Sequence, residues 1–170
     1  MPICVAVPKE TQPGENRVAL IPEVARKLAK LDIEVLIESG AGDRAHYPDD
    51  AYDSARIVTD ADTLYSEADV VLAVQPPSAE TIGKLREGAL YIGLLLPFQR
   101  VEHIAPLKDS NITSFAMELV PRISRAQSMD VLSSQAAVAG YKAVLLAANL
   151  SGKFFPMLTT AAGTIRPARV

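Results

Sequence analysis

The amino-acid sequence predicts a doubly wound α/β domain with a mostly parallel sheet, followed by a long connecting helix. Up to Ala116, short apolar runs alternate with helical patterns, which is the rhythm of β-α-β units. Two of these runs, at Val70–Val74 and Leu90–Leu96, are apolar throughout, which indicates strands covered by helices on both faces. From Ser133 the pattern changes to an alanine-rich helical stretch that ends near Gly152.

The residues between the apolar runs support about five or six strands with helices between them. Pro22 stands where the first helix begins, a position that tolerates its missing N–H group. Ser78 follows two prolines and precedes Thr81 by three positions, as a helix N-cap does. We expect strands at Ile3–Val7, Glu34–Ile37, Val70–Val74, Leu90–Leu96 and Ile112–Ala116, and helices at Pro22–Leu31, Ser78–Arg86 and Val101–Lys108.

The change of pattern near Leu132 predicts two regions. Residues 1–132 form the α/β domain, and residues 133–170 form the connecting helix and a lead-in to a further domain. After the helix we expect a loop of Thr, Ala and Gly residues. We interpret the last residue, Val170, as the first residue of a further strand.

Composition and charge exclude several classes of function. The chain has 170 residues, 49% of them hydrophobic, and a net charge of -3, which is ordinary for one or two soluble globular domains. A pI near 5.4 with scattered basic residues excludes a nucleic-acid surface, because phosphate neutralisation needs clustered Lys and Arg. No run approaches the roughly 18 consecutive apolar residues of a membrane span, and we detect no export signal at the N-terminus.

Several short motifs favour structural roles. Cys4, the one cysteine, lies in an apolar run, so we interpret it as a buried small side chain in a reducing compartment. The segment Gly40–Gly42 lacks the third glycine of a dinucleotide fingerprint and predicts a tight turn at a strand end. His46 and His103 are the two histidines. No ligand cluster accompanies them and no serine lies in a nucleophile context, so we expect neither a metal site nor a catalytic triad.

Two polar segments lie where a ligand could bind. The segment Lys9–Arg17 follows the first expected strand, and in open α/β sheets this place faces the ligand crevice. From its chemistry alone, Arg17 is better explained as an ion-paired or surface arginine than as an anion site. The second segment, Pro121–Gln135, collects arginines, a glutamine and an aspartate between a strand and the long helix. We call it the polar loop, and from composition alone it is either a surface loop or a functional one.

Both segments resemble a known family. Val7–Pro22, with Glu38–Gly42 and Tyr52, resembles the N-terminal signature shared by alanine dehydrogenases and the NAD(H)-binding domain (alpha subunit) of proton-translocating NAD(P) transhydrogenases. The polar loop is similar to the loop by which that transhydrogenase domain positions the dihydronicotinamide ring. The resemblance implies a Rossmann- or flavodoxin-like sheet and a part in hydride transfer between NADH and NADP+.

The resemblance also implies roles for individual side chains. Arg122 and Ser133 would hold the nicotinamide carboxamide and neighbouring groups, and Gln127 would bridge toward the nicotinamide ribose and the NADP(H)-binding partner. Asp130 would orient the ring and the loop. Hydride transfer needs two nicotinamide rings held closely together with water excluded, and it needs no protein nucleophile.

Two positions distinguish the branches of the family. Alanine dehydrogenases hold their amino-acid substrate with a lysine after the fourth strand and a histidine after the fifth. Here these places carry Gln75 and the pair Leu95–Leu96, which supply neither a cation for a carboxylate nor a proton carrier. The sequence therefore favours the transhydrogenase branch. Two alternatives stay open: an oxidoreductase of the alanine dehydrogenase type, and a non-catalytic α/β module whose polar loop docks a partner.

The resemblance implies an assembly as well. It predicts NAD(H) as cofactor of the complete domain and a homodimer that works with an NADP(H)-binding domain and a membrane domain, which couples the reaction to proton translocation. The resemblance locates such a protein on the cytoplasmic side of the bacterial inner membrane, as a peripheral component. The family's glycine-rich fingerprint follows a segment like Arg166–Val170, so we expect the 170 residues alone to bind NADH weakly. In the family, a helix from later in the sequence completes the first domain. The resemblance therefore implies that apolar surface, which this helix would cover, is exposed on these residues.

Overall fold

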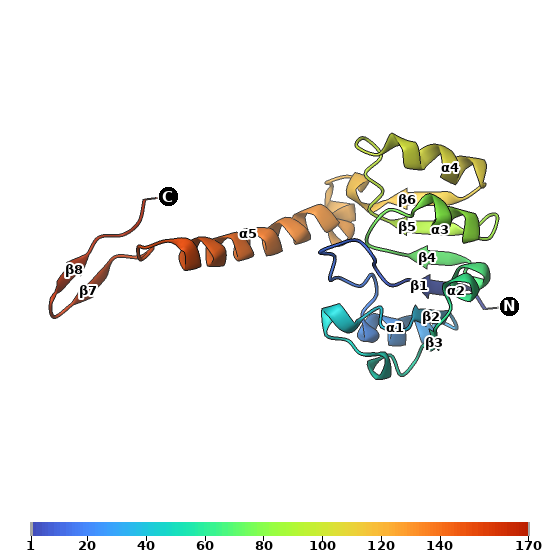
Figure 1. The fold of residues 1–170 in the computed structure, drawn as a ribbon, viewed down its shortest axis with the longest axis horizontal. Coiled ribbons are helices and arrows are strands. Elements are labelled where there is room, and N and C mark those ends of the chain that lie inside the picture. Colours follow the sequence, from blue (N-terminus) through green and yellow to red (C-terminus); the bar gives the residue numbers. More distant parts are fainter. Residues whose placement is uncertain (1, 170) are drawn as a thin grey trace. The chain divides into compact units, whose positions relative to one another are not determined.

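Six parallel strands build the sheet of the N-terminal region of the chain (Figure 1). The structure is a computed structural model and describes residues 2–169. The strands lie in the order β3-β2-β1-β4-β5-β6, and every neighbouring pair is parallel. Their bounds are β1 Cys4–Val7, β2 Glu34–Glu38, β3 Arg56–Val58, β4 Val70–Leu72, β5 Leu90–Gly93 and β6 Thr113–Ala116. The predicted doubly wound α/β fold is confirmed.

The strand order fixes where a ligand can enter. From β1 the chain moves outward through β2 to β3, then returns to pair β4 with the other side of β1. In an open parallel sheet, this reversal leaves a crevice at the carboxyl ends of the two central strands. The segments after Val7 and after Leu72 therefore meet at the carboxyl edge of the sheet.

Four short helices cover the sheet, and their apolar residues assign them to its two faces. Leu64, Ile82 and Leu107, from α2, α3 and α4, share one core cluster with Val71. Ala25 of α1 belongs to a second cluster on the other face. The bounds are α1 Pro22–Ala29, α2 Ala61–Glu67, α3 Ala79–Lys84 and α4 Ile104–Asp109.

The α1 face of the sheet is only partly covered. Val7 and Ile37, on the β1–β2 side, are fully buried. Leu72 and Ile92 point to the same face and are half-buried, and Phe115 beside them on β6 is 56% exposed. Apolar side chains of β4, β5 and β6 are thus accessible on this face of the sheet.

Two elements of the prediction need correction. The expected elements omit β3 and α2, whose short segment Arg56–Glu67 carries many charged and polar residues and shows little apolar pattern. The segment after the long helix, expected to be a loop, forms a two-stranded antiparallel hairpin of β7, Leu158–Thr160, and β8, Gly163–Ile165. Val170, interpreted as the start of a strand, lies outside the described residues.

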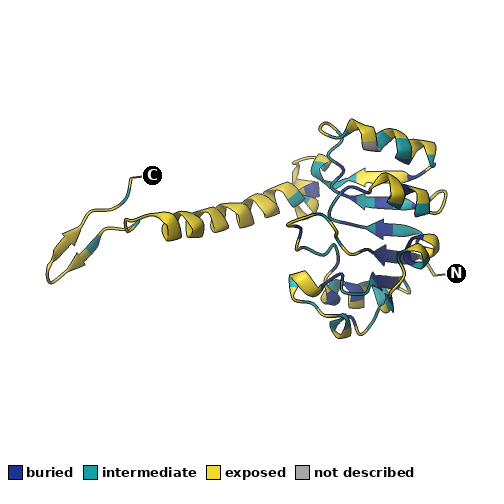
Figure 2. Ribbon diagram, in the orientation of Figure 1, coloured by how far each residue is buried: buried dark blue, intermediate teal, exposed yellow. Residues whose placement is uncertain are grey.

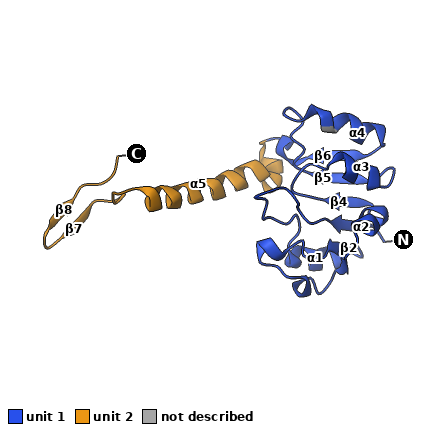
Figure 3. Ribbon diagram, viewed as in Figure 1, with its two compact units in different colours: residues 1–121 blue, residues 122–170 orange. Residues whose placement is uncertain are grey.

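The chain divides into two compact units, residues 1–121 and 122–170 (Figure 3). From Arg122 onward the polar loop thus belongs to the same unit as the long helix, whereas the sequence pattern places a boundary near Leu132. The second unit contains α5, Val131–Leu150, as the long helix was predicted. Almost all of its residues are exposed (Figure 2). By length and composition, α5 is the one helix among the described residues that could cross a membrane, which is weak evidence for a span.

Candidate functional site

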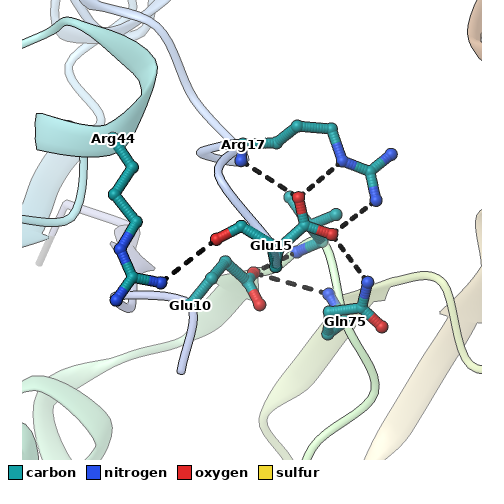
Figure 4. Close-up of polar contacts among 6 residues, drawn as sticks. Glu10, Glu15, Arg17, Arg44 and Gln75 are labelled. Atoms are coloured by element: carbon teal, nitrogen blue, oxygen red, sulfur yellow. Dashed lines mark hydrogen bonds and ion pairs between the residues drawn. The ribbon is translucent and has the colours of Figure 1, made fainter. Parts of the chain in front are cut away.

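A cluster of polar side chains occupies the crevice at the carboxyl ends of β1 and β4 (Figure 4). Both carboxylate oxygens of Glu15 face Arg17: Nε lies 2.7 Å from Oε1 and a terminal guanidinium nitrogen lies 2.6 Å from Oε2. The Gln75 amide, which follows β4, donates to the same Oε2 over 2.7 Å. Arg44 donates to the Glu15 carbonyl oxygen over 3.3 Å. These contacts hold the Lys9–Arg17 segment against the loop after β4.

The electrostatics of Glu15 follow from these contacts. Glu15 is a charged residue that is only 7% exposed. Donation from Arg17 lowers its pKa from 4.5 to about 2, and this effect together with the Gln75 amide exceeds the opposing effect of burial. A buried carboxylate needs such compensation, because an unpaired buried charge is strongly unfavourable.

A second carboxylate, Glu10, holds the loop after β4. Its Oε1 accepts from the backbone N–H groups of Val74 at 2.6 Å and Gln75 at 3.4 Å. Burial raises the pKa of Glu10, against the lowering effect of these two donors. Glu10 thus connects the end of β1 to the end of β4, and its role is to shape the crevice.

The interpretation of Arg17 as an ion-paired arginine is confirmed by its bond to Glu15. Gln75 brings an amide and no positive charge to the cluster. Leu95 is 3% exposed and belongs to the apolar core. An amino-acid carboxylate would therefore meet an arginine that is already bonded to a carboxylate, and no cation at position 75.

A small cavity lies beside the cluster, over the carboxyl ends of the central strands. Its volume is about 190 Å³, below the roughly 300 Å³ at which ligand pockets usually begin. Its walls include Lys9, Glu10, Gln75, Tyr91 and Arg100. Tyr91 donates its hydroxyl to the Gln75 carbonyl oxygen over 2.9 Å. This space is too small for a dinucleotide.

The turn at Gly40–Gly42 is confirmed as a tight exit from β2. Gly40 has φ 72°, a left-handed conformation that costs glycine little. The Ala41 N–H donates back to the Glu38 carbonyl over 2.9 Å. A Cβ on Gly42 would lie 2.3 Å from the Tyr47 carbonyl oxygen, so the glycine is required by close packing. Cys4 is buried, as expected.

The polar loop ends in a capped helix within the second unit. Ser124–Met129 forms a 3-10 turn, and Asp130 then caps α5. The Asp130 carboxylate accepts from the Ser133 backbone N–H over 2.9 Å and from the Ser133 hydroxyl over 2.6 Å. These bonds lower the pKa of Asp130, with a smaller contribution from the charge of Arg122.

The loop presents hydrogen-bonding side chains at its surface. Arg122, Gln127 and Ser133 are exposed, and Asp130 is half-buried. The cap fixes the geometry of Asp130 and Ser133, and the positive charge of Arg122 helps to lower the pKa of Asp130. Sequence reasoning named these four residues but assigned no role to Glu10 or Glu15. Their position directly after the first strand, where a crevice forms, was the available signal.

Comparison with known proteins identifies the family. The family model described as "Alanine dehydrogenase/PNT, N-terminal domain" matches residues 6–139. The chain belongs to this family. It is 46% identical to an NAD(P) transhydrogenase alpha-subunit protein of Rhodospirillum rubrum, over 98% of this chain and 45% of the relative. It is 32% identical to the alanine dehydrogenase of Bacillus subtilis, over 88% of this chain and 39% of that relative.

A solved structure agrees with the sequence comparison. The transhydrogenase from Sinorhizobium meliloti is 46% identical, with a TM-score of 0.91 over 97% of this chain and 50% of that one. The chain thus spans about half the length of the transhydrogenase relatives that it matches. Family membership and fold are therefore established for this N-terminal domain.

Proposed function

We propose that this chain is a component of a proton-translocating NAD(P) transhydrogenase, and that its polar loop positions NADH for hydride transfer to NADP+. The observation that carries the proposal is the polar loop itself, which presents Arg122, Gln127 and Ser133 at its surface next to Asp130, the N-cap of α5. The higher identity to transhydrogenase than to alanine dehydrogenase supports the same branch.

The loop residues fit a nicotinamide carboxamide. The Arg122 guanidinium can donate to the carboxamide oxygen. The Ser133 hydroxyl donates its hydrogen to Asp130, so its oxygen keeps lone pairs that can accept from the carboxamide NH2 group. Gln127 offers an amide that can bridge to a ribose or to a partner domain. NAD(H), when bound, supplies the hydride. The protein's task is to hold the ring at close approach to its acceptor and to exclude water.

The proposal includes partners and a location. An NADP(H)-binding domain would present the second nicotinamide, and a membrane domain would couple the reaction to proton movement. The chain would then lie on the cytoplasmic side of the inner membrane as a peripheral component. The transhydrogenase names of the relatives support the existence of further domains.

We also propose that two copies associate through α5. The helix exposes Val138, Tyr141, Val144 and Leu145, and a helix with apolar residues on several sides needs a cover. Its alanines and Gly140 allow close approach of another helix. Light scattering of the full chain should give twice the monomer mass, and Leu145→Lys should shift it toward the monomer. A monomeric wild type across a wide concentration range contradicts the proposal.

An assay with two substrates separates the proposed function from its alternatives. In the complete protein with its NADP(H)-binding partner, we expect NADH-dependent reduction of NADP+. We expect no alanine-dependent reduction of NAD+, because Gln75 and Leu95 replace the groups that amino-acid oxidation needs. Both reactions are followed by absorbance, and a thionicotinamide analogue of NADP+ is the acceptor in the transhydrogenation assay. Alanine-dependent NADH formation would establish the dehydrogenase instead, and absence of NADH binding would favour a non-catalytic module.

A further inference from the structure

A third carboxylate, Glu118, binds the backbone of the loop after β5. Glu118 lies in the 3-10 turn Met117–Leu119, directly after β6. Its Oε1 accepts from the Leu95 N–H over 3.0 Å and also from the Leu96 N–H, and its Oε2 lies 3.3 Å from the Leu95 nitrogen. Consecutive backbone N–H groups that converge on one anion form a strong binding site for it. Here the anion is a side chain of the protein.

The Glu118 contact lies beside a strained residue. Leu96 has φ 50°, a left-handed conformation that costs a residue with a Cβ roughly 1 kcal/mol or more. Its N–H donates to the half-buried Glu118, and its carbonyl oxygen accepts from the N–H groups of Gln99 and Arg100 over 2.9 and 2.8 Å. Hydrogen bonds on both sides of Leu96 therefore hold the loop in a backbone shape that leucine otherwise avoids.

The contact is one link in a series that joins the strand ends. Glu10 holds the loop after β4 through the Val74 N–H. The Val74 carbonyl then accepts from the Leu94 N–H over 3.1 Å, and Glu118 holds the next two residues of that loop. Four strand ends, those of β1, β4, β5 and β6, are thereby connected.

Glu118 makes the last contact of this series, just before the chain enters the polar loop. Three residues, Leu119 to Pro121, separate it from Arg122. We infer that Glu118 is a positioning residue for hydride transfer, which fixes the starting point of the polar loop by anchoring the end of β6 to the loop after β5. The inference rests on the proposed function. It assigns Glu118 no contact with cofactor or substrate.

Glu118→Ala and Glu118→Gln test this inference in the complete protein. The alanine variant loses both acceptors, and we expect its single-turnover rate of hydride transfer from NADH to fall about 10-fold, since a misplacement of roughly 1 Å can cost about 100-fold. Glutamine keeps one acceptor oxygen and should restore much of the rate. The NADH dissociation constant should change less than about 3-fold, because the pyrophosphate contacts lie elsewhere. Glu80→Ala, at a residue whose side chain is 79% exposed, is the matched control.

The outcomes separate this inference from the proposed function. A wild-type protein without transhydrogenation overturns the proposed function itself. An active wild type with wild-type rates in Glu118→Ala overturns the positioning role. If Glu118→Ala does not fold, Glu118→Gln decides: equal losses in rate and in NADH affinity indicate a merely structural residue and overturn the inference, whereas a reduced rate at unchanged affinity supports it.

Discussion

Replacement of Arg122 by alanine is expected to slow hydride transfer by roughly 10- to 100-fold in the complete protein. The substitution removes a charged donor from the cofactor carboxamide, and such a hydrogen bond is worth about 1.5 to 3 kcal/mol. Gln127→Asn and Asp130→Asn should slow the reaction less, by about 10-fold, because they shift the ring without removing a charged donor. NADH affinity should change much less than the rate in both asparagine variants, since the proposal assigns the pyrophosphate and adenosine contacts to residues outside the polar loop.

The structure makes the Asp130 variant informative. Asparagine caps helices as well as aspartate does, so Asp130→Asn retains the cap on α5 while it removes the charge. Asp130→Ala also removes the bonds from Ser133 and should cost about 1 kcal/mol of helix stability. Arg125→Ala, an exposed arginine in the same loop, serves as the control. For each variant, the single-turnover rate of transhydrogenation is measured beside equilibrium NADH binding. Wild-type rates in Arg122→Ala, Gln127→Asn and Asp130→Asn would show that the loop is only a connector.

The Glu15–Arg17 pair is expected to be the main acid-sensitive contact of the crevice. The pKa of Glu15 is about 2 when folded and 4.5 ordinarily. A lowered folded-state pKa stabilises the fold above the unfolded value, and this contribution disappears as the pH falls from about 4.5 toward 2. Glu15→Gln should therefore reduce the free energy of unfolding by on the order of 2 kcal/mol at pH 7, a figure discounted for the partial exposure of Arg17. The difference from wild type should shrink as the pH approaches 3.

Urea denaturation of the full chain at pH 7, 5, 4 and 3 measures this pH dependence. The matched control is Glu23→Gln, which breaks an exposed ion pair with Lys27 and should change the free energy of unfolding much less at each of these pH values, because water screens exposed charges. Equal losses for the two variants at pH 7 would contradict the assignment of Glu15 as a compensated buried charge.

The fold could be predicted where apolar runs were long. Val70–Val74 and Leu90–Leu96 located β4 and β5, because short apolar runs between turn signals favour strands, although the structure buries these strands fully on one face only. Arg56–Val58 failed this test, since an edge strand of three residues with one charge has no such pattern. The β7–β8 hairpin was missed because its strands are short and mostly exposed.

The candidate site shows a similar division. The polar loop could be named from the sequence because its residues are neighbours in the chain. The contacts of Glu10 and Glu118 could not, because each joins a side chain to backbone N–H groups of a segment distant in sequence. Leu96 gives no sequence signal of its left-handed backbone, since leucine rarely adopts it.

In the complete protein, we expect the nicotinamide to bind at the polar loop and not in the crevice beside Gln75. A crystal structure of the complete protein with bound NADH tests this most directly. We predict the carboxamide within hydrogen-bonding distance of Arg122 or Ser133, with the Glu15–Arg17 pair intact. A nicotinamide ring bound against Gln75 and Tyr91, with the polar loop making no contact to NADH, would contradict the proposed role of the loop.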